Sequence, residues 1–207
     1  MDKLDVLLEH FPLYSEDLGI DLKEPAGRFK WFVAALLFGA RISEKIAAKT
    51  YKRFEAYGLD SPEKIIAAGW DELVRVLDEG GYVRYDFSTA TKLLGIMDAL
   101  RARYGSLEEL YEGAVDTENL KKRLLAFKGV GAVTAQIFLR ELRGVWQISP
   151  EVSTRAQLAA KNLAINLHEL EGETLARVET ALVKLSLRYC AKKRCDECPV
   201  KDLCKQV

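Results

Sequence analysis

Four cysteines close together near the end of the sequence constrain this chain more than any other feature. They form the array Cys190-x4-Cys195-x2-Cys198-x5-Cys204. The chain between successive thiols is too short to carry them far apart, so all four can converge on one centre. Compact runs of four cysteines are typical of iron–sulfur clusters, whereas structural zinc usually takes two C-x2-C pairs separated by a longer insert. We therefore expect a [4Fe–4S] cluster on these four residues, with zinc, or disulfides and free thiols, as the alternatives.

Composition indicates a globular protein with a substantial core. The chain has 207 residues, of which 49% are hydrophobic, enough for one large or two small domains. The opening segment MDKLDVLLEHF is acidic and amphipathic, and no apolar run approaches the roughly 20 residues that cross a bilayer. We expect a soluble cytoplasmic protein without a membrane partner, since a reducing compartment also preserves thiols. The 31 basic and 31 acidic residues give zero formal net charge, so a nucleic-acid partner requires a local basic face.

Apolar residues recur at helical spacing along nearly the whole chain, and no alternating run of strand length competes with them. The sequence therefore predicts an all-α protein. Polar caps mark helix starts: Ser43 precedes one helix, Ser61 followed by Pro62 precedes the next, and Ser88 or Thr89 is expected to begin a later one. The expected helices cover residues 2–11, 29–37, 43–58, 62 onward, 71–80, 90–104, 107–111, 119–127, 132–142 and 173–189.

A helix-hairpin-helix motif is the second strong signal. An amphipathic helix runs to Phe127, the four residues Lys128-Gly129-Val130-Gly131 reverse the chain, and another helix follows at once. The glycines permit backbone conformations closed to other residues and leave the amides before the second helix uncovered. Such amides form a site for one phosphate without reading base sequence. The local positive charge is expected from Lys121, Lys122, Lys128, Arg140 and Arg143. The alternative is an ordinary helical hairpin whose glycines only permit tight packing.

The hairpin, the helical periodicity and the four-cysteine array together resemble the endonuclease III family of DNA glycosylases, in the helix-hairpin-helix-GPD superfamily. The resemblance extends from about Pro25 to Cys204. The family's hairpin reads LPGVG, then two variable residues and TA, and this chain has FKGVGAVTA ending at Ala135. The family's catalytic aspartate, which lies at the start of a helix after the hairpin, corresponds to Glu151 in the phrase ISPEVSTR.

The resemblance implies a two-lobed helix-hairpin-helix glycosylase fold with a C-terminal [4Fe–4S] loop. Residues 27–139 would form a helical barrel that ends in the hairpin, and residues 1–26 with 140–207 would form the iron–sulfur domain. The 80–82 segment resembles the loop whose side chain inserts into the duplex, with an ordinary packed loop as the alternative. The implied DNA-binding residues are Lys128, Gly129, Val130 and Gly131 of the hairpin, Tyr82 and Arg84 of that loop, and Lys192, Lys193 and Arg194 of the cluster loop.

Four departures from the family pattern bear on activity. Val133 stands where bifunctional members have the lysine that attacks the sugar as an amine, so the lyase step should be absent. Glu151 is one methylene longer than the family's aspartate. The first gap of the cysteine array is shorter than in the family. Ala40 stands where many members present a glutamine, so contacts to the base or the opposite strand cannot be carried over at that position.

Together these features predict a monofunctional DNA glycosylase of base-excision repair. The enzyme would hydrolyse the N-glycosidic bond of a damaged or mismatched base flipped out of double-stranded DNA, with Glu151 as the catalytic residue. We expect a monomer in the cytoplasm, associated with the nucleoid in a prokaryote. Two alternatives from other classes are a non-catalytic DNA-binding or redox-sensing protein of the same fold, and a zinc-stabilised helical interaction module.

Overall fold

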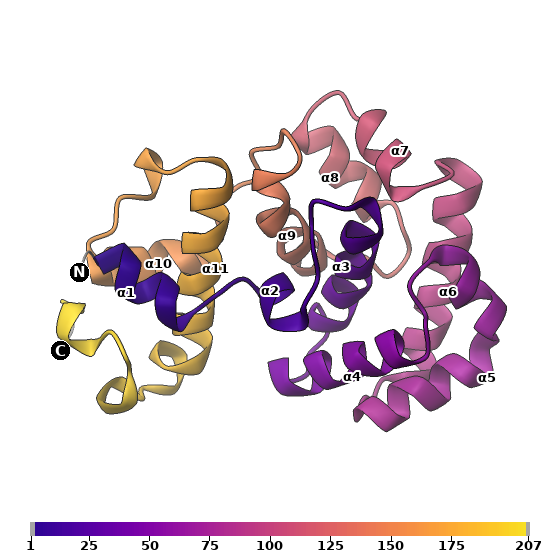
Figure 1. Ribbon diagram of the computed structural model, residues 1–207, viewed down its shortest axis with the longest axis horizontal. Helices are drawn as coiled ribbons and strands as arrows, with labels where there is room; N and C mark the ends of the chain where they lie inside the picture. Colours follow the sequence, from indigo (N-terminus) through magenta and orange to yellow (C-terminus); the bar gives the residue numbers. More distant parts are fainter. Residues whose placement is uncertain (1–2, 206–207) are drawn as a thin grey trace. The chain divides into compact units, whose positions relative to one another are not determined.

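The computed structural model describes residues 3–205, and all the regular structure in that range is helical (Figure 1). The all-α prediction is confirmed. The first helix was expected to begin at Asp2, which lies outside the described residues. By its internal contacts the chain divides into two compact units. One consists of Ile20–Phe138, and in the other the segment up to Gly19 joins the residues from Leu139 onward. We call them the helical unit and the cysteine unit. The boundaries expected from the sequence were residues 27 and 139.

The helical unit is built around α3 and the helices that follow it. Its helices are α3 (Pro25–Phe38), α4 (Glu44–Ala56), α5 (Pro62–Gly80), α6 (Asp86–Arg103), α7 (Leu107–Glu112), α8 (Thr117–Leu125) and most of α9 (Ala132–Glu141). The near-continuous apolar sequence of α3 is explained by its burial: Trp31 and Phe32 are fully buried, and Trp31 Nε1 donates a hydrogen bond to the Phe138 carbonyl at 3.1 Å. Helix α5 packs against α4 and α6.

Local capping explains where most of these helices begin. The Ser43 hydroxyl accepts a hydrogen bond from the Ile46 amide, and the Ser61 hydroxyl accepts one from Lys64, as the sequence predicted. The start of α6 differs from the prediction. Ser88 Oγ donates to the Tyr85 carbonyl instead of capping, and α6 already begins at Asp86. Tyr85 is therefore the N-cap residue of α6, and Phe87 lies in its first turn.

A glycine divides α5 into two helical segments. Gly69 has φ +74° and ψ 176°, a conformation that no helix contains and that residues with a side chain rarely adopt. The separate short helix expected from Asp71 to Gly80 is therefore present as the second segment of α5. Gly81 then closes it with φ +97°.

Residues 20–26 belong to the helical unit because Arg28 holds them there. Arg28 Nη1 donates to the carbonyls of Leu22 and Lys23 at 2.9 and 2.7 Å, while its other nitrogens bind the Glu108 carboxylate. Gly27 permits this close approach, since a Cβ there would lie 1.7 Å from the Asp21 carbonyl oxygen.

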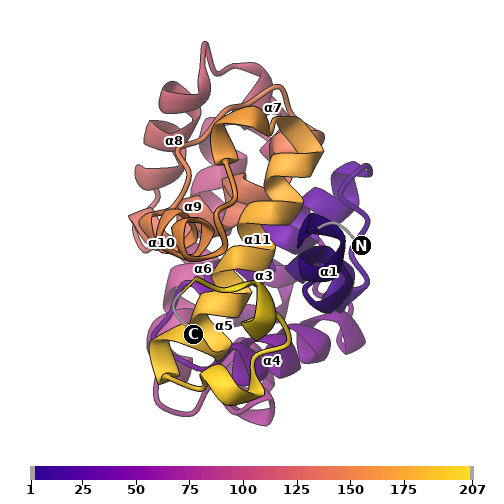
Figure 2. The same ribbon diagram turned by 90° about the vertical axis from the view of Figure 1, so that its left-hand side faces the viewer.

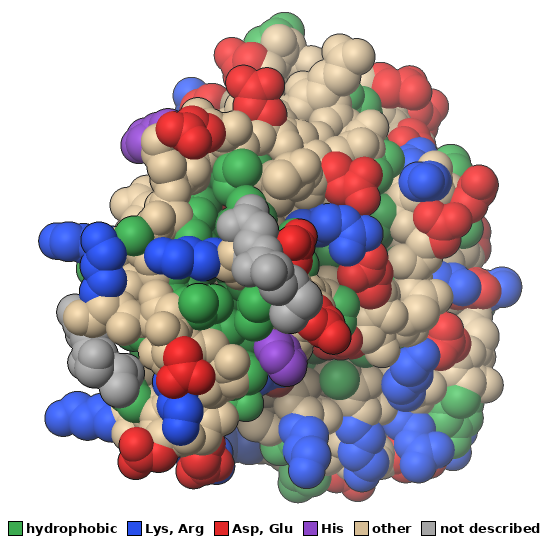
Figure 3. Space-filling model, turned by 60° about the vertical axis from the view of Figure 1, so that its left-hand side comes forward, with side chains coloured by type: hydrophobic (Ala, Val, Ile, Leu, Met, Phe, Trp, Pro, Cys, Tyr) green, Lys and Arg blue, Asp and Glu red, His purple; other side chains and the backbone are tan. Residues whose placement is uncertain are grey.

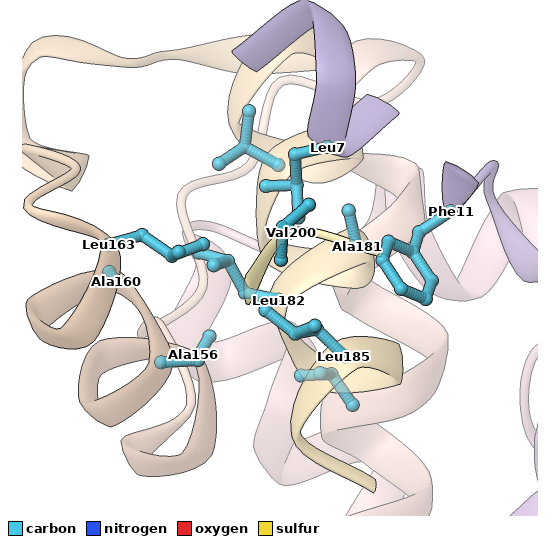
Figure 4. Packing of buried hydrophobic residues seen from close by; sticks show 12 residues of the cluster. Leu7, Phe11, Ala156, Ala160, Leu163, Ala181, Leu182, Leu185 and Val200 are labelled. Carbon is cyan, nitrogen blue, oxygen red and sulfur yellow. The ribbon is translucent and has the colours of Figure 1, made fainter. Parts of the chain in front are cut away.

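In the cysteine unit, α11 packs against both α1 and α10 (Figures 1 and 2). An apolar cluster fills the space between them. Val200, from the segment that carries the cysteines, belongs to this cluster together with Leu7 of α1 and Leu182 of α11 (Figure 4). The elements of this unit are α1 (Lys3–His10), α2 (Tyr14–Leu18), η1 (Leu142–Gly144), α10 (Thr154–Leu163), η2 (Leu167–Glu169), α11 (Gly172–Arg188), η3 (Cys190–Lys192), η4 (Cys195–Glu197) and η5 (Lys201–Leu203).

Buried polar contacts fix the N-terminal segment to the same unit. Lys184 of α11 is fully buried, and its ammonium donates to the Asp17 carboxylate at 2.7 Å and to the Pro12 carbonyl. Burial lowers the pKa of Lys184, and Asp17 opposes that effect. Glu141, also buried, accepts hydrogen bonds from the amide and the hydroxyl of Ser15 at 3.0 and 2.7 Å.

The surface carries charges of both signs. Basic and acidic side chains are interspersed over the face that Figure 3 shows, in keeping with a formal net charge of zero. Within residues 3–205, no helix has the length and apolar character needed to cross a membrane.

Candidate functional site

The hairpin between α8 and α9 is a tight turn in which Phe127 and Val130 are buried and the residue at the tip, Lys128, is exposed. The Val130 amide donates to the Phe127 carbonyl at 3.0 Å. Gly129 has φ +110°, which this turn requires and a residue with a Cβ would disfavour. The sequence prediction of a helix-hairpin-helix is therefore confirmed in its local geometry.

The amides at the start of α9 face open space. The Gly131 carbonyl accepts from the Ala135 amide at 3.0 Å, so the helix begins directly after Gly131. Within the described part of the chain, the amides of Gly131, Ala132 and Val133 have no hydrogen-bond acceptor. A Cβ placed on Gly131 would meet no atom within 4 Å. Three uncovered donors at the positive end of a ten-residue helix, beside Lys128, suit an anion such as a phosphate.

Two of the arginines expected to add positive charge here do not do so. Arg140 and Arg143 are 3% and 5% exposed and belong to the cysteine unit, where Arg140 Nε donates to Thr180 Oγ1 at 3.1 Å and Arg143 pairs with Glu179. The expectation failed because apolar periodicity does not reveal which arginines are buried. Local charge at the hairpin comes instead from lysines.

A small pocket adjoins the hairpin inside the helical unit. Its volume is about 70 Å³, and it is lined by Leu36, Gly39, Ala40, Tyr82, Thr89, Lys92, Leu93, Ile96, Gly129 and Thr134. Gly39 is required for the packing, since a Cβ there would lie 2.0 Å from Thr134 Oγ1. An apolar cavity of about 150 Å³ is known to hold benzene, so a pocket of this size does not enclose a nucleobase.

Lys92 is a functional candidate that sequence reasoning missed. It lines the pocket, and its side chain runs over Gly129, where a Cβ would approach Lys92 Cγ to 2.9 Å. Lys92 therefore adds a second cation next to the hairpin tip. No local sequence signal marks it, because the contact joins α6 to a turn far along the chain.

The prediction that Tyr82 inserts into DNA is corrected by its burial. Tyr82 is 1% exposed, and its hydroxyl donates to the Leu37 carbonyl at 2.7 Å, so the ring is part of the core. Burial raises the pKa of its phenol. The exposed side chains of this region are Val83 and Phe87, at 63% and 60%, together with Arg84, whose guanidinium lies over the Tyr85 ring.

Glu151 lies in an irregular segment of the cysteine unit, with its side chain exposed. Its carboxylate makes no hydrogen bond or ion pair with any residue in the range 3–205. The family's aspartate lies at the start of a helix, whereas here Glu151 precedes the helix: α10 begins at Thr154, with Ser153 as its N-cap. The backbone around Glu151 is nevertheless fixed. The Pro150 carbonyl accepts from Arg143, and the Val152 carbonyl accepts from Gln157 at 3.0 Å.

Cys190 and Cys195 begin the short turns η3 and η4, Cys198 and Cys204 directly follow η4 and η5, and no disulfide joins these four residues. Cys190 and Cys195 are exposed, and Cys198 and Cys204 are half-buried. Burial raises the pKa of Cys190, and like-charge repulsion by the other three thiols raises it further. In residues 3–205 no group of three or more potential ligands is arranged to hold a metal ion. The donor set fits an iron–sulfur cluster or zinc chemically, although the thiols do not form a preassembled site.

The basic residues of the cysteine segment are exposed. Arg194 forms an ion pair with Glu197, whereas Lys192 and Lys193 have no ion-pair partner in the described range. Exposed pairs of this kind are weak, so a phosphate can compete for Arg194. The DNA-binding residues expected from the sequence thus fall on both units, and the structure brings together those of the hairpin.

Comparisons with known proteins rest on structure. No family model matches the chain, and no curated protein matches it in sequence. In structure it is similar to the H. pylori 3-methyladenine DNA glycosylase MagIII, solved bound to 1,N6-ethenoadenine. The chain shares the fold of this DNA glycosylase. The TM-score is 0.57 at 16% sequence identity, and the similarity covers 91% of this chain and 98% of the other. The glycosylase fold expected from the sequence is therefore confirmed.

Proposed function

We propose that this protein is a DNA glycosylase of base-excision repair that hydrolyses the N-glycosidic bond of a damaged or mismatched base without cleaving the strand. The observation that carries the proposal is the glycosylase fold, shared over nine-tenths of the chain with an enzyme that acts on 3-methyladenine. The substrate is duplex DNA. Because the structural relative is named for an alkylated purine and was solved with ethenoadenine, modified adenines are the first bases to test.

The hairpin is assigned to the DNA backbone. Lys128, Lys92 and the uncovered amides that end at Val133 supply two cations and three donors in one place. A phosphate accepts hydrogen bonds from such amides whatever the base sequence, so the contact positions the duplex and does not select the lesion.

Glu151 is assigned to the chemistry. When the bond between the base and C1′ breaks, the bonding electrons leave with the base and positive charge develops on the sugar. A carboxylate stabilises that charge and orients a water, whose oxygen forms the new bond to C1′ and whose proton is taken up by the carboxylate. The exposed, unpaired side chain on a fixed backbone supports this role.

Val133 supports the absence of a lyase step. Its side chain is 60% exposed at the first turn of α9 and has no amine to form a Schiff base with the sugar. The abasic site would therefore remain in an intact strand until alkali cleaves it.

The four cysteines are proposed to hold a [4Fe–4S] cluster. Cys190, Cys195, Cys198 and Cys204 would supply its four ligands, and a cluster with four protein thiolates serves as a structural centre with no open iron. Val200 already anchors this segment in the apolar cluster. The exposed lysines of the first gap would then approach a phosphate.

The proposal is tested with duplex oligonucleotides that each carry one lesion or mismatch, assayed with and without hot alkali. Cleavage that depends on alkali is expected for at least one lesion. Glu151→Gln should lower excision by at least about a hundredfold, or roughly 2.7 kcal/mol of barrier, and should still bind DNA. Glu171→Gln, which neutralises another exposed carboxylate of the same unit, is the matched control.

Two outcomes would contradict the proposal. Equal excision by Glu151→Gln and the wild type would remove Glu151 from the chemistry. Duplex binding without excision of any lesion in the panel would favour the second function considered from the sequence, a non-catalytic DNA-binding or redox-sensing protein of the same fold.

A further inference from the structure

We infer that Arg143 and Glu179 form a buried clamp that holds the segment carrying Glu151, so that both are positioning residues for base excision. The inference rests on the proposed function, since it concerns how Glu151 is presented. From the sequence, Arg143 was expected only to add positive charge near the hairpin, and Glu179 was not singled out. Both lie in the cysteine unit, together with the segment that they hold.

The contacts of the pair bracket Glu151 on both sides. The side chains of Arg143 and Glu179 are 1% and 0% exposed and form an ion pair. Arg143 Nη2 donates to the Pro150 carbonyl, one residue before Glu151, and Glu179 Oε1 accepts from the Ser153 amide at 2.9 Å, two residues after it. The backbone is therefore tied at both ends of the four-residue span from Pro150 to Ser153.

The Ser153 contact also ties this span to α10. Ser153 is 6% exposed, and its hydroxyl accepts from the Ala156 amide at 3.3 Å, so it is the N-cap of the helix. Glu179 thus fixes the N-cap residue of α10, and the Gln157 side chain of the same helix donates a hydrogen bond back to the Val152 carbonyl. Of the two residues between Pro150 and Ser153, Val152 has its carbonyl held by Gln157, whereas neither the side chain nor the carbonyl of Glu151 accepts a hydrogen bond from any residue in the range 3–205.

The energetics of a buried ion pair favour a positioning role over a stabilising one. Removing two charges from water is costly, and well-packed apolar replacements of such pairs are often neutral or stabilising. Here the cost is increased because Arg143 Nε is buried without a hydrogen-bond partner in the described structure. The remaining hydrogen bonds of this ion pair both go to the span from Pro150 to Ser153. We therefore infer that the pair fixes the backbone on both sides of Glu151.

The same helix provides a matched contrast. Lys184, one and a half turns after Glu179 on α11, is also fully buried and also pairs with a carboxylate, that of Asp17. Its contacts go to Asp17 and Pro12, in the N-terminal segment, and none goes to the span around Glu151. Disrupting Lys184 therefore perturbs a buried charge of the same unit without releasing that span.

The test compares single-turnover excision by Glu179→Gln, by the double variant Arg143→Met/Glu179→Leu and by Lys184→Met, all well below their melting temperatures. The two clamp variants should lose about tenfold to a hundredfold in excision rate, since small misplacements of a reacting group cost that much, and should bind duplex with unchanged affinity. Lys184→Met should excise at the wild-type rate. The double variant keeps the test valid where Glu179→Gln, which leaves Arg143 unpaired, fails to fold.

A residue that acts through Glu151 has no effect once Glu151 is neutral. Combining the clamp variants with Glu151→Gln should therefore give no further loss of excision, whereas a general structural defect would add to it. Additive losses, or an equal loss in Lys184→Met, would overturn the inference.

Hydrogen exchange separates the inference from the proposed function. In the clamp variants the Ser153 amide should exchange faster than in the wild type, while in Lys184→Met it should not. If the wild type excises no base, the proposed function fails and exchange alone decides whether the clamp exists. Unchanged protection of Ser153 in the clamp variants would overturn it.

Discussion

Adding a methyl group at each of the two hairpin glycines should separate the stability of the hairpin from its contact with DNA. Gly129→Ala places a Cβ at φ +110°, which costs about 1–2 kcal/mol, and the reduced freedom of the unfolded chain returns about 0.4–1 kcal/mol. The steric contact with Lys92 adds little, because a lysine side chain can move aside. The free energy of unfolding should fall by roughly 1 kcal/mol, and the melting temperature by about 2–4 °C.

Gly131→Ala should leave the stability of the protein unchanged and weaken its binding to DNA. Its φ is not in the left-handed region, and its Cβ meets no atom within 4 Å, so the melting temperature should be unchanged or slightly higher. The methyl group would stand where a phosphate approaches the amides of α9. Losing one hydrogen bond to a charged group costs about 1.5–3 kcal/mol, so duplex affinity should fall at least about tenfold.

Calorimetry and fluorescence anisotropy with a labelled duplex at low salt measure the two effects. Gly131→Ala that binds DNA as tightly as the wild type would refute the placement of the phosphate at the hairpin. Gly129→Ala that unfolds at the wild-type temperature would refute the argument from backbone strain.

Three further predictions concern the cysteine segment, the buried phenol and the missing amine. Cys195→Ser should remove iron and the broad absorbance near about 400 nm, and a colourless wild type with stoichiometric zinc would establish the zinc alternative instead. Tyr82→Phe should cost about 1 kcal/mol at neutral pH, since it leaves the Leu37 carbonyl unpaired. Burial raises the pKa of Tyr82 in the folded protein, so above pH about 10 the unfolded chain loses the phenol proton before the folded chain does. The wild-type free energy of unfolding, measured by urea titration, should therefore fall above this pH with a steeper slope than that of Tyr82→Phe. Wild-type protein should give no DNA adduct with borohydride, whereas Val133→Lys should gain one, and trapping by the wild type would point to Lys92 or Lys128.

Local rules in the sequence predicted the helices and the hairpin well. Ser43 and Ser61 cap their helices as expected because a cap is settled within four residues of chain. The turn at Gly129 is equally local. Where two local options compete, as at the start of α6, the choice between Asp86 and Ser88 depended on a hydrogen bond that the pattern does not show.

The sequence did not predict which polar side chains are buried. Tyr82 was expected at the surface because it follows two glycines, yet its hydroxyl finds a carbonyl on α3. Arg143 was expected to add positive charge at the hairpin and Glu179 was not singled out, because their buried partners lie up to 36 residues away in the sequence. Charge at helical spacing predicts an exposed face, and only the three-dimensional packing shows which of these charges turn inward.

The division of the chain also sets an order for its synthesis. The helical unit is one continuous stretch, Ile20–Phe138, whereas Asp17 must wait for Lys184, 167 residues further along. At roughly 5–20 residues per second, the ribosome delivers that lysine about 8–33 s later. Until α10 and α11 have been synthesised, the apolar face of α1, including Leu7, lacks the residues that these two helices contribute to its cluster. The apolar face of α1 therefore stays exposed on the nascent chain until the C-terminal helices emerge.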